Sequence, residues 1–101
     1  MFSIVIEPPA HRDIEDHITY LEEHAHSPDY PETWYDSIIQ AIFGLSDFPF
    51  SFALAPENNE FEEEVRHRIV GSYRVLFTVK DDCVSVLHVR HGRQDVLRPG
   101  T

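Results

Sequence analysis

The sequence is poor in basic residues and in cysteine, and each shortage excludes a class of protein. Among its 101 residues, 18 side chains are acidic and only 8 are basic, with one lysine. A chain with this mean charge repels nucleic acid, so we expect no direct DNA binding. The single cysteine, Cys83, excludes an internal disulfide framework and a multi-cysteine zinc site. Four glycines and seven prolines exclude a fibrous or low-complexity chain.

Long hydrophobic runs are also missing. No stretch approaches the roughly 20 apolar residues that a membrane span needs. The apolar start of the chain has no preceding basic residues and stops at Glu7, Pro8 and Pro9, which is too short for an export signal. We therefore expect a cytoplasmic protein without membrane contact. Because 42% of the residues are hydrophobic, residues 1–101 can build the core of one domain.

Seven histidines invite a metal site, but their spacing does not support one. His24 and His26 are two residues apart, and His11 and His17 are six apart, whereas a helical zinc pair needs a spacing of four. Asp13 and His17 have that spacing, yet two ligands do not make a site. The chain also has no glycine-rich phosphate loop and no dinucleotide-binding fingerprint, so we expect neither a metal nor a cofactor.

The charges divide sharply along the chain. Residues 1–64 hold 15 acidic side chains and one basic side chain, Arg12, whereas residues 65–101 hold three acidic and seven basic ones. Any anionic partner must therefore contact the C-terminal third. The acidic part can equally be a solvated surface that keeps the protein soluble.

Hydrophobic periodicity predicts the elements of the first half. Apolar residues alternate from Phe2 to Ile6, which indicates a strand that ends at the two prolines. A helical stripe then predicts a helix over residues 9–26. A second stripe, at spacings of three and four, predicts a helix over 31–46, whose apolar face comprises Trp34, Ile38, Ala41, Ile42 and Leu45. The short turn between them favours an antiparallel helical hairpin.

The second half predicts three strands after an irregular stretch. Residues 47–61 contain an apolar segment bounded by prolines and then a polar loop. Alternating patterns predict strands over 63–70, 73–80 and 83–90, separated by Gly71-Ser72 and Asp81-Asp82 turns. The order β-α-α-β-β-β predicts an α+β domain in which a helical hairpin packs on one face of an antiparallel sheet. The other face of the sheet is expected to stay open.

Several segments of the sequence match the pattern of a known superfamily. They are residues 13–20 and 34–45 in the predicted helices, Phe48-Pro49 after them, and residues 68–77 and 86–95 in the strands, with a strand motif G-x-Y-R and an ending H-G-R-x-D. Over nearly its whole length the sequence therefore resembles the RelE/ParE superfamily, and the two motifs are typical of ParE-like members. The resemblance implies a toxin of a bacterial type II toxin–antitoxin module, of the kind that stabilises plasmids, with the β-α-α-β-β-β fold.

The resemblance also implies partners, and it leaves the target open. A cognate antitoxin would neutralise the toxin. ParE-like members inhibit DNA gyrase by binding, and the H-G-R-x-D ending and the single lysine favour this function. RelE-like members are enzymes that cleave mRNA on the ribosome, which needs several cations around the scissile phosphate. A third alternative is a family member that keeps the fold but has lost toxicity.

Arginines of the C-terminal third are the candidate residues for binding a target or a phosphate. The resemblance implies an active-face arginine at Arg74, and arginine offers phosphates a two-pronged, permanently charged donor. Arg66 and Arg68 are two apart in the preceding predicted strand, so they share a face and could extend a basic strip beside Arg74. Alternatively, these side chains are solvated or neutralise the acidic loop at 62–64. The full set is Arg66, Arg68, Arg74, Arg90 and Arg93.

His91 is the candidate catalytic residue if the protein is a nuclease. A histidine titrates near neutral pH and can act as general acid or base while a ribose 2′-hydroxyl attacks the phosphate. The resemblance supports this role in RelE-type nucleases, with Arg74 as its catalytic partner. In ParE-like members the same segment occurs without nuclease chemistry, and His91 then contacts a partner or has a structural role.

Overall fold

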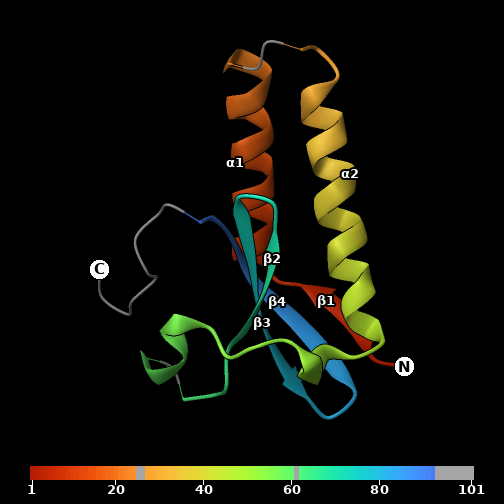
Figure 1. Cartoon of the computed structure of the whole chain (residues 1–101), viewed down its shortest axis with the longest axis vertical. Coiled ribbons are helices and arrows are strands. Elements are labelled where there is room, and N and C mark those ends of the chain that lie inside the picture. The colour runs from red at the N-terminus through yellow and green to blue at the C-terminus, as the bar shows by residue number, and fades with distance from the viewer. Residues whose placement is uncertain (25–26, 61, 93–101) are drawn as a thin grey trace.

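A computed structural model describes residues 1–24, 27–60 and 62–92 of the chain. Two helices stand side by side on a single sheet, and their connected ends extend beyond it (Figure 1). The elements are β1 (Ser3–Ile6), α1 (Pro8–His24), α2 (Tyr30–Phe43), β2 (Arg66–Val70), β3 (Tyr73–Lys80) and β4 (Cys83–His91). Between α2 and β2 lie three short 3-10 helices, η1 (Gly44–Ser46), η2 (Pro49–Ser51) and η3 (Pro56–Glu60).

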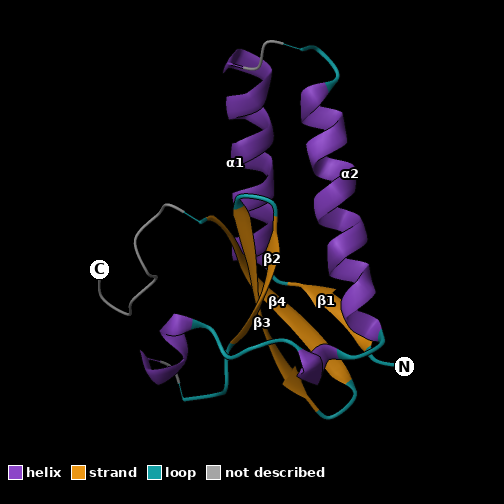
Figure 2. Cartoon of the chain, viewed as in Figure 1, coloured by secondary structure: helices purple, strands orange, loops and turns teal. Residues whose placement is uncertain are grey.

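The sheet confirms the predicted α+β class, and one of its strands runs parallel to its neighbour. Its strand order is β1-β4-β3-β2, with antiparallel pairing of β2 with β3 and of β3 with β4 (Figure 2). β1 pairs with β4 in parallel, so that Ser3 lies opposite Cys83 and Ile6 opposite Val86. The sequence predicts an antiparallel sheet, and β1 alone runs parallel to its neighbour. The helices and the β2–β3 hairpin lie between β1 and β4 in the chain and give the long connection that parallel neighbours require.

Two-residue turns join the strands of the meander. Gly71 in the first turn has a φ of 59°, and Asp81 in the second has a φ of 56°. Tight hairpin turns need such left-handed backbone because it matches the twist of the flanking strands, and glycine and aspartate tolerate it better than most residues. These turns place β2, β3 and β4 side by side and so fix which residues share a face.

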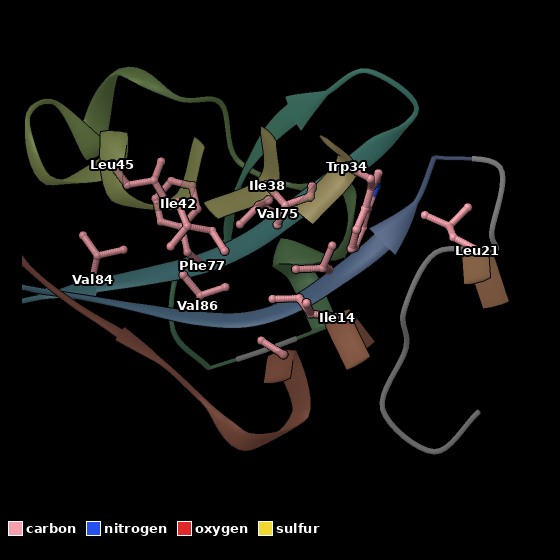
Figure 3. Packing of buried hydrophobic residues seen from close by; sticks show 12 residues of the cluster. Ile14, Leu21, Trp34, Ile38, Ile42, Leu45, Val75, Phe77, Val84 and Val86 are labelled. Atoms are coloured by element: carbon pink, nitrogen blue, oxygen red, sulfur yellow. The ribbon is translucent and has the colours of Figure 1, made fainter. Parts of the chain in front are cut away.

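The main core lies between the helices and the sheet. Every residue of the predicted apolar face of α2 is buried, and Figure 3 shows Trp34, Ile38, Ile42 and Leu45 in a row against the strands. α1 contributes Ala10, Ile14 and Leu21, and the sheet contributes Val75, Phe77, Val84 and Val86. Burial of each large side chain stabilises the fold by about 1.5–3 kcal/mol.

The opposite face of the sheet is partly covered, contrary to the expectation that it stays open. The segment before β2 folds back over this face, and Ala55 and Val65 form a second small core with Leu76. Backbone hydrogen bonds hold it there, from Ala55 N to Val65 O at 2.7 Å and from His67 N to Ala53 O at 3.1 Å. The apolar residues between the prolines explain the fold-back, because they need a surface to bury against.

Within the described residues, neither helix is long and apolar enough to cross a membrane.

Candidate functional site

Arg74 lies on the face of β3 that points away from the helices, and its guanidinium is already paired. Its Nη1 donates to Glu57 Oε1 at 3.0 Å, and its Nη2 donates to Glu57 Oε2 at 2.8 Å. Arg74 is 9% exposed and Glu57, in η3, is 0% exposed. The two-pronged donor that sequence reasoning assigned to a phosphate therefore holds a buried carboxylate in this structure.

His67 on β2 completes this buried group. Its Nδ1 lies 3.4 Å from Arg74 Nη1. Burial lowers the pKa of His67, and the positive charge of Arg74 lowers it further, against an opposing effect of Glu57. A neutral imidazole accepts a hydrogen bond from the guanidinium without placing a second positive charge there. The group has the form of a structural ion pair that fastens η3 to the sheet.

The expected basic strip is not formed, because Arg66 and Arg68 face the other way. Arg66 lies opposite Phe77 and Arg68 opposite Val75, so both arginines are on the helix side of the sheet. Arg66 Nη1 donates to Phe52 O at 2.7 Å, and Arg68 Nη1 donates to Ala41 O at 2.9 Å. These arginines tie the end of α2 and the following segment to β2.

A glycine makes room for one of these bonds. A Cβ at Gly44 would lie 2.8 Å from Arg68 Nη1, which is too close unless the guanidinium shifts. Glycine at this position therefore lets the guanidinium lie close to the main chain just after α2.

The two candidate nuclease residues lie on opposite faces of the sheet. Tyr73 pairs with His91 across β3 and β4, and Arg74 pairs with Arg90. Because consecutive residues of a strand alternate faces, His91 and Arg74 point in opposite directions. The His91 ring instead meets the Tyr73 ring edge-on, with centroids 5.0 Å apart. Arg93 lies outside the described residues.

His91 belongs to a cleft between α1, the start of α2 and the ends of β3 and β4. The cleft has a volume of about 290 Å³. Its lining comprises Asp13, Asp16, His17, Tyr20, Trp34, Tyr73, Val89, Arg90 and His91. The four residues from α1 are spaced i, i+3, i+4 and i+7, so they form one stripe of the helix. We call this group of nine residues the aromatic cleft.

Rings packed around His17 form the base of the aromatic cleft. The Tyr73 hydroxyl and His17 Nε2 share a hydrogen bond. The His17 ring lies 4.5 Å from the Trp34 ring and 4.7 Å from the Tyr73 ring, measured between centroids. Burial lowers the pKa of His17 and nearby His91 lowers it further, whereas burial raises the pKa of Tyr73, with smaller effects from Tyr30 and Tyr20. Both groups are therefore neutral at physiological pH.

Asp13 joins the helix to the exposed edge of β4. Its Oδ2 accepts hydrogen bonds from the Val89 backbone N–H at 3.0 Å and from His88 Nδ1 at 2.9 Å. β1 pairs with β4 only as far as Val86, so Asp13 satisfies a backbone donor that the strand pairing leaves over.

Sequence reasoning missed the aromatic cleft and the Glu57 partner of Arg74. The cleft had a signal, since Asp13, Asp16, His17 and Tyr20 repeat at helical spacing beside the apolar stripe. Glu57 had a weaker signal, an acid directly after an apolar segment. Within the described residues, no three histidine, cysteine or acidic side chains come together as metal ligands.

The sequence also matches a known family. The sequence model described as the ParE toxin of the type II toxin–antitoxin system parDE matches residues 4–96. The chain belongs to this ParE toxin family. The match runs through all four strands and both helices, so the buried Glu57–Arg74 pair and the aromatic cleft both lie within the ParE region. No curated protein matches the sequence closely enough to count as a relative.

Solved structures share the ParE fold of this chain at low sequence identity. The chromosomal ParDE system from P. aeruginosa has a chain that aligns with a TM-score of 0.74 and 17% identity, over 90% of this chain and 96% of that one. The RelBE2 toxin–antitoxin complex from Mycobacterium tuberculosis gives a TM-score of 0.58 and 19% identity, over 89% and 96%. The YoeB-YefM toxin–antitoxin complex from Staphylococcus aureus gives 0.52 and 15%, over 90% and 97%.

Proposed function

We propose that this ParE-family chain is a toxin that a cognate antitoxin neutralises, and that it acts by binding a cytoplasmic target, DNA gyrase, without cutting RNA. The family match supports the toxin role. The choice between binding and cleavage depends on the placement of the candidate catalytic residues.

The separation of His91 from Arg74 carries this proposal. Cleavage by a ribose 2′-hydroxyl needs a proton acceptor and a charge-stabilising group that converge on one phosphate. Here the two groups lie on opposite faces of the sheet, and Glu57 occupies the donors of Arg74. A phosphate at Arg74 would have to displace a fully buried carboxylate. The arrangement therefore favours inhibition by contact over catalysis on RNA.

An exposed apolar surface supports an antitoxin partner. Phe48 is 77% exposed, and the exposed apolar side chains near it in the sequence are Phe43, Phe50 and Leu54. Clusters of exposed apolar side chains usually mark protein interaction sites. β2 is also an edge strand, and among the described residues a bridge from Leu54 to Arg66 covers only its beginning. An added strand or an amphipathic helix of the antitoxin could bury this surface.

Controlled expression in bacteria tests the toxin role and its mechanism together. We expect expression to inhibit growth, and co-expression of a short adjacent reading frame to relieve the inhibition and to co-purify with the chain. Primer extension on cellular mRNA should show no induced cuts, and purified protein should inhibit supercoiling by gyrase. His91→Ala should leave growth inhibition largely intact.

Two outcomes would contradict the proposal. Codon-positioned mRNA cuts that disappear in His91→Ala would establish the ribosome-dependent nuclease instead. Stable, abundant protein that neither slows growth nor binds the adjacent gene product would indicate a family member that has lost toxicity. The double variant Phe48→Ser and Phe50→Ser, with Tyr35→Ser as an exposed control on α2, locates the antitoxin surface by co-purification.

A further inference from the structure

The aromatic cleft has a chemical character that the toxin role does not use. Its described lining includes tyrosine, tryptophan and histidine rings together with the two α1 carboxylates, Asp13 and Asp16. Aromatic faces beside a carboxylate attract a cation, because the ring quadrupole and the negative charge both favour it. We propose that the aromatic cleft binds the arginine side chain of a partner protein.

The charges of the described lining favour a cation over an anion. His17 is neutral at physiological pH, because burial and His91 lower its pKa. The described lining then holds two carboxylates, Asp13 and Asp16, and one guanidinium, that of Arg90. The surrounding field has the same sign, since residues 1–64 carry 15 acidic side chains and one basic one. A phosphate would meet repulsion from the α1 wall.

Asp16 is the carboxylate that is available to a ligand. Asp13 already accepts hydrogen bonds from Val89 and His88. Asp16 is exposed, and it makes no hydrogen bond or ion pair within the part of the chain that the structure describes. One turn further along α1, Tyr20 is 54% exposed, and the His24 ring stacks on it with centroids 4.2 Å apart. A guanidinium paired with Asp16 therefore contacts the part of the tyrosine ring that His24 leaves exposed. Arginine suits this site better than lysine because its planar group stacks on rings and pairs with carboxylates at once.

Trp34 gives a reason to expect a peptide. It is 6% exposed, and its indole Nε1–H has no hydrogen-bond acceptor among the residues that the structure describes. An unsatisfied buried donor is unfavourable, and an arginine side chain carries no acceptor. A peptide brings main-chain carbonyls next to its arginine.

The identity of the partner protein rests on the proposed function. The preference of the cleft for an arginine side chain does not depend on that function. The antitoxin is the natural source of the arginine if the chain is a neutralised toxin. The cleft then forms a second contact on α1 and α2, apart from the exposed phenylalanines after α2.

A peptide titration tests the cleft directly, because Trp34 is the only tryptophan in the chain. The probe is acetyl-Gly-Arg-Gly-amide, added to the full chain while the fluorescence and the indole N–H NMR signal of Trp34 are recorded. We expect a saturable change with this peptide, a smaller affinity for the lysine peptide, and none for the citrulline peptide, which has the same shape without the charge. Asp16→Asn should weaken binding about fivefold or more, a loss of about 1 kcal/mol. Glu22→Gln, an exposed acid on α1 outside the cleft, is the matched control and should bind like the parent.

Several results would overturn the proposal. These are equal binding of arginine and citrulline peptides, equal binding by Asp16→Asn, or no Trp34 response to arginine at any soluble concentration. A Trp34 response to inorganic phosphate or to a short RNA, with none to the arginine peptide, would make the cleft an anion site. The titration requires neither toxicity nor an antitoxin, so its failure leaves the proposed toxin role intact. A chain without toxicity could still bind the peptide, which separates the two proposals.

Discussion

At the scale of single residues, Arg74 shows how burial changes the meaning of a functional motif. The G-x-Y-R pattern predicts an arginine that is available to a phosphate, whereas the folded chain gives that arginine a carboxylate from a distant segment. A buried ion pair adds little net stability compared with apolar residues, because both charges lose their hydration. Removal of one partner is different, since it leaves an uncompensated charge in the interior.

The Glu57–Arg74 pair gives the first prediction. We expect Glu57→Ala to lower the free energy of unfolding by about 3–5 kcal/mol, because Arg74 stays buried without a carboxylate to balance its charge. Replacement of both residues, Glu57→Leu with Arg74→Met, should recover much of that loss. Urea denaturation, monitored by circular dichroism, measures the free energy of unfolding of the parent protein and of the two variants.

An exposed acid serves as the control for this pair. Glu64 has a carboxylate 3.8 Å from Arg66 Nη2, and its side chain is 68% exposed. Glu64→Gln should change the free energy of unfolding by less than about 1 kcal/mol. If Glu57→Ala proves as mild as this control, Glu57 and Arg74 are not a buried pair in solution.

Two half-buried histidines, His17 and His67, give the second prediction, a loss of stability in mild acid. Burial is the main cause that lowers the pKa of His17 and of His67 in the folded protein. The unfolded chain then binds protons first as the pH falls through about 6.5, the ordinary value for histidine. Their contribution to stability is present in full above that pH and is lost between it and the lowered pKa values of the folded state.

Denaturation between pH 7.5 and pH 5 measures this loss. Each histidine contributes at most about 1.4 kcal/mol per pH unit to the slope. His17→Gln should flatten the dependence of the unfolding free energy on pH, and a second substitution, His67→Gln, should flatten it further. His11→Gln, exposed on α1, is the control. An unchanged slope in the double variant would mean that other groups govern the acid response.

At the scale of elements, the sequence predicts most of the architecture because periodicity records local burial. The apolar face predicted for α2 is the buried face, and the strand predicted over 73–80 has those bounds as β3. The predicted boundaries are wrong where one kind of secondary structure passes into another without a clear break in the sequence pattern. The helix predicted over 31–46 ends at Phe43 and continues as η1, and the strand predicted over 63–70 begins at Arg66.

Contacts between distant segments were beyond the reach of a single sequence. The alternation of apolar and polar residues indicates which side of a strand is apolar. It does not indicate which segment of the chain covers that side. The fold-back of Ala55 against Leu76, and the pairing of Arg74 with Glu57, depend on a turn in residues 47–65 that has no regular period. The candidate arginines were misplaced because a single sequence does not give the register between two strands. In the register observed, Arg66 and Arg68 share the face of Val75 and Phe77, opposite to Arg74.

At the scale of the whole molecule, folding engages part of the positive charge of the C-terminal third inside the protein. Arg66, Arg68 and Arg74 use their guanidinium groups to fasten segments of this chain. Three of the seven basic side chains in the C-terminal third therefore make internal contacts, whereas most acidic side chains of α1 remain exposed. A partner with charges of both signs would fit such a molecule, with cations against α1 and anions near the C-terminal third.

This asymmetry gives the last prediction, on the rate of association with the antitoxin. Attraction between exposed charges should make association fast at low salt and slower as salt rises, because the screening length falls from about 10 Å at 0.1 M to about 3 Å at 1 M. Charge reversal of Arg93, in the basic third, should slow association more than reversal of Arg12, which stands among acidic residues. Stopped-flow mixing of purified toxin and antitoxin measures these rates. The difference between Arg93→Glu and Arg12→Glu should shrink toward zero at 1 M salt. Equal rates for both variants at low salt would mean that the basic third only balances charge and does not guide the partner.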